Sequence, residues 1–424
     1  MRKRYLVGIS LAVAALVAPQ AAFAAGFANT AHSATATGMA GVAVANPDEP
    51  NANFYNPASM AFLDDFNVYV GNTTIMPSVS YEHPGDDQFN TDSVSQVFPP
   101  PNFHAAVPVT DDFTVGLGAA YTWGLGIEWP EDWVGREALV SQDLETFNLN
   151  PNVAYKIPGT ELSVSAGMQV LFASLRLQQT AMIRHDREVD VILGGSGYGF
   201  GGTAAAMFRP SENITVGVNY RSAARINYDG NAHFSEDVEG TPFEQRMLDQ
   251  EISTSITMPH TLNAGIGYRP MDELWVGLDV NYMTWSTYDE VEVEFSQQSP
   301  QGEPGETEPS TVIPGHWEDA VAVRLGTQYS LTDSLNARLG FAFDMTPVPD
   351  ETVAPSLPDN NRHVFGAGVG YTMMGIRADL GYNFIYLRER EIANGNVDGN
   401  YQLSSHLVGI NVGYGFGGGG GEIN

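Results

Sequence analysis

Four arginines are the residues of this chain whose types and positions most readily suggest ligand chemistry. Each lies in a segment where apolar and polar residues alternate, and each falls on the polar side: Arg221, Arg324, Arg338 and Arg377. A guanidinium matches a carboxylate in bidentate fashion, so one or two of these arginines are candidates for ligand binding or gating. Three aspartates share the polar side of such segments: Asp279, Asp344 and Asp379. The alternative is therefore an internal network of salt bridges, because buried charges need partners.

Other kinds of chemistry find little support. The nine histidines are scattered without an HExxH pattern and cysteine is absent, so we expect no metal site and no disulfide framework. The glycine-rich run at 195–201 is not followed by a helical pattern, which argues against nucleotide binding and leaves no cofactor to predict. A net charge of −31 argues against nucleic acid as a partner. We therefore expect that the protein is not an enzyme.

The elements that must position the arginines are strands. In residues 214–218, for example, Ile214, Val216 and Val218 alternate with Thr215 and Gly217. A period of two indicates strand rather than helix. Fourteen such segments are expected, at roughly 65–80, 101–109, 112–126, 144–157, 161–178, 195–209, 212–229, 253–269, 273–296, 318–330, 334–347, 362–373, 375–390 and 401–416.

The links between these segments alternate in length. Short turns such as 109–112 and 158–160 are followed by long loops such as 127–143 and 179–194. An even number of strands with this layout is typical of an outer-membrane barrel. A β-sandwich also alternates, but its strands are usually only about 5–6 residues long, and here aromatic residues gather near strand ends. We predict an all-β fold, a 14-stranded antiparallel transmembrane β-barrel with a small N-terminal helical hatch plugging its lumen.

The first residues carry the features of an export signal. A basic start, a short apolar run and Ala22-Phe23-Ala24 describe a cleaved signal peptide. No later stretch is long and apolar enough to predict a transmembrane helix. We expect a signal peptide at 1–24, the hatch at 25–63, the barrel at 64–416 and a flexible glycine-rich tail at 417–424. The expected location is the bacterial outer membrane, with both termini periplasmic.

The triplet Asn56-Pro57-Ala58 is the expected anchor of the hatch. Asparagine is a strong N-cap residue, and Pro57 falls at the first helical position, where its missing N–H costs nothing. The local sequence alone is equally consistent with an ordinary turn. The predicted barrel has an interior that a helical segment could block, which favours the interpretation as a hatch over that as a turn.

Several segments of the chain resemble one known family. The start Gly26-Phe27, the run GMAGVA at 38–43 and the run FYNPA at 54–58 are similar to the hatch of the FadL-type long-chain fatty-acid transport family. The run MPHTL at 258–262, the run YMTWS at 282–286 and the segment 338–344 resemble central and later strands of that family. The resemblance spans almost the whole mature chain.

The resemblance implies a mechanism as well as a fold. It implies passive, ligand-gated uptake of a long-chain fatty acid or another hydrophobic ligand, with lateral release into the membrane where the third strand kinks. Four glycines of that strand, read as facing inward, are the kink candidates: Gly116, Gly118, Gly124 and Gly126. Such glycines permit a bulge, although they equally make room for the hatch. Gly26 and Phe27 are expected to contact ligand or take part in gating.

The substrate class stays open at this point. Arginines and aspartates of the interior are nearly balanced, which weakens the case for an anion site, so aromatic or alkane hydrocarbons are the alternative substrates. An open general porin is a further alternative. Expected partners are outer-membrane lipid and lipopolysaccharide and the barrel assembly machinery, and the protein is expected to be a monomer.

Overall fold

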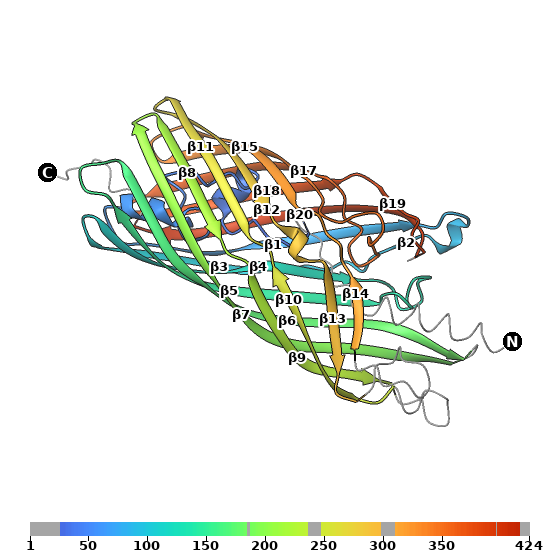
Figure 1. Cartoon of the computed structure of the whole chain (residues 1–424). Coiled ribbons are helices and arrows are strands. Elements are labelled where there is room, and N and C mark those ends of the chain that lie inside the picture. The colour runs from blue at the N-terminus through green and yellow to red at the C-terminus, as the bar shows by residue number, and fades with distance from the viewer. Residues whose placement is uncertain (1–25, 185–186, 236–246, 298–309, 396, 416–424) are drawn as a thin grey trace.

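The chain forms a closed barrel of 14 antiparallel strands (Figure 1). The computed structural model describes residues 26–184, 187–235, 247–297, 310–395 and 397–415. The uninterrupted barrel strands are β1 (Asn67–Glu82), β3 (Pro101–Thr110), β4 (Phe113–Glu128), β5 (Ser141–Lys156), β6 (Leu162–Arg184), β7 (Arg187–Ser211), β16 (Leu335–Asp344), β17 (Arg362–Met373) and β20 (Gly399–Tyr414).

The remaining barrel strands are each interrupted once. These pairs are β8 (Ile214–Arg221) with β9 (Ala224–Phe234), β10 (Gln250–Met258) with β11 (Thr261–Met271), β12 (Leu274–Met283) with β13 (Glu290–Phe295), β14 (Ser310–Pro314) with β15 (Ala320–Ser330), and β18 (Ile376–Leu387) with β19 (Arg390–Ile392). The short strand β2 (Thr91–Asp92) pairs with the far end of β1. Two single-turn helices lie in links, η3 (Asp87–Phe89) and η4 (Trp285–Thr287).

The first and last strands close the barrel. β1 pairs with β20 from Val68 opposite Tyr414 to Glu82 opposite Asn400. Closure removes the free sheet edges, which would leave backbone N–H and C=O groups unpaired in a membrane. The prediction of a 14-stranded antiparallel barrel with a small helical N-terminal region is confirmed.

The alternation of residue types separates the two faces of the wall. In β8, Val216, Val218 and Tyr220 are exposed on the outer surface, whereas Thr215 and Asn219 are buried in the interior. This outer apolar band is the surface that a barrel presents to lipid. Among the described residues, no helix is long and apolar enough to cross a membrane.

One predicted loop is wrong. Residues 179–194 were expected to be a long loop, but β6 and β7 continue through most of that range, with Gln179 opposite Val191 and Ala181 opposite Val189. All four of these side chains are buried on the interior face, and three of them are apolar. The alternation of inward-facing and outward-facing residues continues beyond the length needed to cross a membrane. The pairing of β6 with β7 therefore extends with it.

The described N-terminal residues fill one half of the barrel interior, the blue helices of Figure 1. Helix α2 (Ala34–Gly38) packs against β17, β18 and β20, and η2 (Pro57–Phe62) packs against β5, β6 and β7, with α3 (Ala52–Tyr55) leading into η2. Ser33 caps α2 by accepting a hydrogen bond from the Ala36 N–H at 3.0 Å. Glycine on the wall permits this close approach, since a Cβ at Gly340 would lie 2.1 Å from the Met39 carbonyl carbon.

Two of the four predicted segments of the chain can be compared with the structure, the hatch and the barrel. The expected signal peptide, 1–24, and the expected tail, 417–424, lie outside the described residues. Gly26, the first described residue, is buried inside the barrel. Its place is set by the aromatic side chains on which it packs.

Candidate functional site

Asn56 joins the hatch, here residues 26–63, to the barrel wall. Its side-chain oxygen accepts a hydrogen bond from the Ala58 N–H at 3.1 Å and so caps η2. Its amide nitrogen donates to the Val44 carbonyl at 2.9 Å and to the Ala206 carbonyl of β7 at 3.1 Å. Pro57 occupies the first helical position, and the Ala58 carbonyl accepts from Ser163 of β6 at 2.8 Å. All three predicted anchor residues therefore lie at the hatch–wall contact, while their anchoring role stays a prediction.

Arg324 connects the hatch to a buried carboxylate. Its Nη1 donates to the Ala40 carbonyl at 3.0 Å and its Nη2 to Asp344 at 2.9 Å. The third nitrogen, Nε, donates to Asn281 at 2.6 Å. Every nitrogen of this guanidinium therefore has a partner, which favours the salt-bridge alternative for Arg324 over a role in ligand binding.

Arg338 and Arg377 share one aspartate in the same half of the lumen. Asp379 accepts from Arg338 Nη1 at 2.7 Å and from Arg377 Nε at 2.7 Å. Arg377 also donates to the hydroxyl of Thr35 in α2 at 3.0 Å. All of these side chains are nearly or fully buried. The network is the kind of internal salt bridging that holds a hatch to its wall.

Arg221 differs from the other three because, in the part of the chain that the structure describes, it forms no ion pair. Its Nη2 donates to the backbone carbonyls of Asn53 at 3.0 Å and Phe54 at 2.9 Å and to the side chain of Asn150 at 2.9 Å. It lines a cavity of about 80 Å³ above the hatch, together with Arg324. The two arginines give one side of this cavity a positive charge.

Two titratable hatch groups are buried. Glu49 Oε1 accepts from the Ser33 hydroxyl at 2.7 Å and from the Asn51 N–H at 3.1 Å, and burial raises the pKa of Glu49 to about 7. Burial, assisted by the charge of Arg221, lowers the pKa of His32 to about 3. Both shifts favour neutral side chains inside the hatch.

Phe27 sits at the centre of an aromatic box, by which we mean Trp123, Trp285, Tyr288 and Trp317. The Phe27 ring centroid lies 4.7 Å from that of Trp285 and 5.7 Å from that of Trp317, and Phe27 is fully buried. Edge-to-face packing of this kind stabilises beyond simple burial. Sequence reasoning identified Phe27 but missed the box, because Trp123 of β4 is far in the chain from the other three members, which lie in links between strands.

The N-terminal segment, residues 26–30, hydrogen-bonds along a free edge of β4. The Gly124 N–H donates to the Phe27 carbonyl at 3.1 Å, and the Asn29 N–H donates to the Thr122 carbonyl at 2.9 Å. Ala28 thereby pairs with Trp123. The edge is available because the pairing of β3 with β4 ends at Asn102 opposite Ala120.

A cavity in the wall lies beside this part of β4. Residues 98–101 run past the upper part of β4 and, with Tyr121 to Gly126, Leu144 and Glu145, line a cavity of about 160 Å³. The register of β4 against β5 shifts between Tyr121 and Trp123, which marks a bulge at Thr122. The third barrel strand is therefore irregular, with the N-terminal segment against its irregular part.

The bulge divides the four predicted kink glycines into two pairs. Gly116 and Gly118 face the hatch, since a Cβ at either would meet Met60, Asn53 or Phe54. Beyond the bulge, Leu125 and Ile127 turn inward. The inward orientation expected for Gly124 and Gly126 is therefore wrong, because the extra residue reverses the alternation. Whether any of the four produces the kink stays a prediction.

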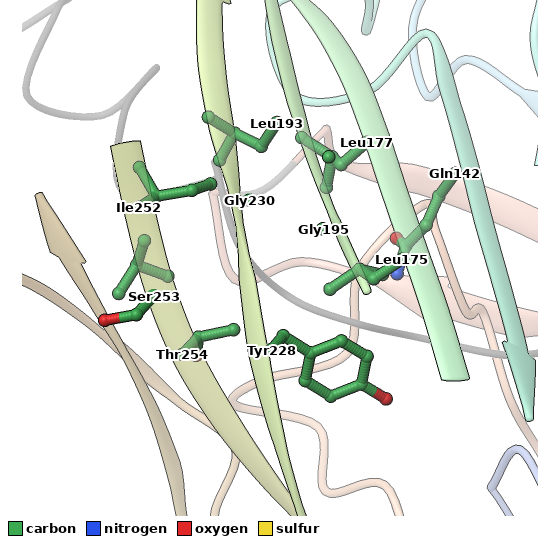
Figure 2. A pocket seen from close by; sticks show the side chains of 12 residues that line it. Gln142, Leu175, Leu177, Leu193, Gly195, Tyr228, Gly230, Ile252, Ser253 and Thr254 are labelled. Atoms are coloured by element: carbon green, nitrogen blue, oxygen red, sulfur yellow. The ribbon is translucent and has the colours of Figure 1, made fainter. Parts of the chain in front are cut away.

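An apolar pocket lies between strands in the half of the barrel away from the hatch (Figure 2). Leu175, Leu177, Leu193 and Ile252 line it, and Gly195 and Gly230 leave space between them. No signal in the sequence distinguished these residues, since they follow the same alternation as every other strand. The interior thus changes from polar around the hatch to apolar at the opposite end.

Comparison with known protein families gives a match over nearly the whole chain. The family described as outer membrane protein transport protein (OMPP1/FadL/TodX) matches residues 14–416. A long-chain fatty acid transport protein of Salmonella typhi is 25% identical, over 96% of this chain and 98% of that protein. The protein of the same description from Escherichia coli K12 is 24% identical over the same shares.

Solved structures have the same architecture. A FadL homologue of Pseudomonas aeruginosa is 19% identical with a TM-score of 0.79, covering 94% of this chain and all of that one. The Ralstonia pickettii toluene transporter TbuX is 16% identical with a TM-score of 0.68, covering 90% of this chain and 97% of that one. At these identities the likeness establishes the fold.

Proposed function

We propose that this chain, which belongs to the OMPP1/FadL/TodX family of outer membrane transport proteins, takes up long-chain fatty acids across the outer membrane and releases them sideways into it. Its family is one of transport proteins rather than enzymes. Relatives that match over nearly their full length are described as long-chain fatty acid transport proteins. These descriptions share transport of a hydrophobic molecule with that of the structurally similar toluene transporter.

The proposal rests mainly on two features found together, a lumen filled by the hatch and a cavity in the wall beside β4. The hatch lies in the polar half of the interior and is bonded to the wall by Asn56 and Arg324, which supports a closed lumen over an open general porin. The apolar pocket of Figure 2 offers an entrance. The cavity beside Thr122 offers an exit, and Phe27 and Ala28 stand against it.

Gating then follows from the position of the N-terminal segment. A ligand that binds better when Phe27 has left the aromatic box shifts the population toward the open state. The hydrogen bonds of residues 27–29 with β4 break in that state. The ligand then passes between β4 and residues 98–101 into the membrane, without crossing the hatch.

A second candidate substrate is a neutral aromatic hydrocarbon. A structurally similar protein is described as a toluene transporter, and Arg324, Arg338 and Arg377 are each paired with an aspartate, which weakens the case for an anion site in the hatch network. Both candidates use the same scaffold. The partners we propose besides the ligand are outer-membrane lipid, lipopolysaccharide and the barrel assembly machinery, with the protein acting as a monomer.

Uptake of labelled oleate by cells that lack and then regain this protein tests the proposal. We expect restored uptake on complementation, with excess unlabelled toluene competing weakly. Equal uptake in both strains would refute fatty-acid transport. Strong competition by toluene would instead favour the hydrocarbon substrate. A large steady conductance in planar bilayers would indicate an open porin.

A further inference from the structure

A row of aromatic side chains crosses the outer face of the wall on four neighbouring strands. Tyr121 of β4 lies opposite Phe147 of β5 in the strand register. Phe147 lies opposite Phe172 of β6, and Phe172 lies opposite Tyr198 of β7. Directly opposite residues share one face of a sheet, and Phe172 and Tyr198 are exposed. The row has the character of the aromatic girdle that marks the edge of an apolar band.

A row of small and acidic residues lies beside the aromatic row, on the side of the long loops. Glu145 lies opposite Ser174, Ser174 opposite Ser196, and Ser196 opposite Asp229 of β9. All four are exposed. The two rows together line a groove of about 600 Å³ on the outer face, which we call the outer groove. An aromatic girdle alone accounts for the rings but not for the hollow beside them.

The outer groove adjoins the cavity beside β4 that we propose as the exit. Tyr121 and Glu145 line both spaces. Gly124 lies opposite Glu145 in the register, and a Cβ there would meet nothing closer than 3.7 Å. A molecule that leaves through the cavity therefore reaches the outer groove before the rest of the lipid-facing surface.

The charges of the outer groove select for the head group of a bound molecule. Glu145 and Asp229 form no ion pair among the residues that the structure describes. Arg176 lies one row further toward the loops, opposite Asp143. Two carboxylates repel a carboxylate or a phosphate, but they accept hydrogen bonds from a hydroxyl or from a protonated carboxyl group. The groove thus favours an uncharged amphiphile over an anionic lipid.

We propose that the outer groove is an exit site, which binds the transported molecule as an uncharged amphiphile after it has left the barrel. Its apolar chain lies along the rings of Phe147, Phe172 and Tyr198. Its hydroxyl or protonated carboxyl group donates a hydrogen bond to Glu145 or Asp229. Apolar walls with a few polar groups at one end are typical of such ligand sites. The inference rests on the proposed function and names the form of the molecule at its exit, a fatty alcohol or the protonated form of a fatty acid.

Photolabelling of the purified protein in phospholipid vesicles tests this site. The probes are a fatty alcohol and a fatty acid of equal chain length that each carry a diazirine, and mass spectrometry maps the labelled residues. We expect the alcohol to label the strands around Phe172 and Tyr198 saturably, with displacement by excess oleyl alcohol. The acid should label the same residues about three- to tenfold less at about pH 9, where it is ionised.

Ser174→Trp fills the outer groove without altering the interior. We expect it to lower saturable labelling by about tenfold or more, and Ser196→Trp on the neighbouring strand should do the same. Ser404→Trp is the matched control, because Ser404 lies on β20 opposite the exposed Tyr386 and is not part of the groove. Its labelling should equal that of the unmodified protein. Heat-modifiable migration in gels verifies that each variant is folded.

The double variant Glu145→Gln with Asp229→Asn tests the choice of head group. We expect labelling by the acid at about pH 9 to rise to within about twofold of labelling by the alcohol. Equal labelling by the two probes in the unmodified protein would overturn the preference for an uncharged head group.

Three results would overturn the exit site itself. Labelling that does not saturate, or that Ser174→Trp and Ser404→Trp lower equally, would show only the contact that any lipid makes with the wall. Displacement of the alcohol by lipopolysaccharide added to the vesicles would assign the groove to a resident lipid. Any of these results together with normal oleate uptake refutes the exit site alone, whereas absence of oleate uptake by the unmodified protein refutes the proposed function.

Discussion

At the scale of single residues, Asn56 makes three hydrogen bonds that no other residue type reproduces. It caps η2 and donates to one carbonyl in the hatch and one in β7. Asn56→Ala removes all three and leaves buried carbonyls without donors, which should loosen the hatch by about 2–4 kcal/mol. The expected result is a raised leak conductance in planar bilayers with the barrel still folded.

Asn56→Asp separates the two functions of this side chain. An aspartate keeps the cap acceptor but faces the carbonyls of Val44 and Ala206 without a donor. We expect its leak to match that of Asn56→Ala. If neither substitution changed conductance or folding, the anchoring role would be wrong.

Glu49 should make the hatch sensitive to pH. Its pKa in the folded protein, about 7, lies above the ordinary value of 4.5. The folded state therefore keeps a proton that the unfolded hatch loses between these values, and stability falls as pH rises from about 4.5 to about 7. The loss at pH 8 is at most about 3 kcal/mol. His32, with its pKa lowered to about 3, has the opposite dependence below pH 6.5.

Glu49→Gln removes the pH dependence of hatch stability that is due to Glu49 and leaves the one that is due to His32. A glutamine oxygen still accepts from Ser33 and Asn51. Hydrogen exchange of hatch amides should be slower in the variant than in the unmodified protein at pH 8 and similar at pH 5. Identical exchange in the two proteins at pH 8 would show that Glu49 is not held neutral by its surroundings.

At the scale of elements, the bulge in β4 and the cavity beside it form the lateral opening that we propose. Gly124 lines this cavity, and a Cβ there would meet nothing closer than 3.7 Å. Gly124→Leu should therefore fold normally and fill the opening. We expect oleate uptake to fall by about tenfold or more, since a leucine side chain there occupies the proposed path.

Gly202→Leu, in β7, is the control for that substitution. A Cβ at Gly202 meets no atom within 4 Å, so the same side chain is added to a strand away from the opening. Its uptake should equal that of the unmodified protein. Unimpaired uptake by Gly124→Leu would mean that the molecules leave by another route.

The strands were predictable because one simple rule governs them. A wall between lipid and a filled interior requires alternation, and the residues of β8 or β16 follow it without exception. The rule fails at Thr122, where one extra residue reverses the faces of Gly124 and Gly126. Alternation also does not indicate where a strand ends outside the membrane. β6 and β7 continue to pair through residues that we expected to form a loop.

The site was less predictable for a different reason. Alternation placed Arg221, Arg324, Arg338 and Arg377 in the interior, and the structure buries or half-buries each of them there. It could not tell which partners they meet, because closure of the barrel brings together residues distant in the chain. The aromatic box arises in this way, since Phe27 meets Trp317.

At the scale of the whole molecule, the interior is divided into two parts with different properties. Around the hatch it is polar and held by paired charges; at the other end it is lined by the largest cluster of apolar residues. We propose that such an arrangement admits hydrophobic molecules. The N-terminal segment contacts both the aromatic box and β4, and we propose that its movement controls the route.

A reversible lock on that segment tests the route most directly. Ala28 pairs with Trp123, and the chain has no cysteine of its own, so Ala28→Cys combined with Trp123→Cys should give one disulfide at a pair with suitable geometry. The two single variants control for loss of each side chain. Oleate uptake is measured on the same cells before and after a reducing agent. We predict uptake below about a tenth of the single-variant level when oxidised and full recovery on reduction; equal uptake in both states would contradict gating by this segment.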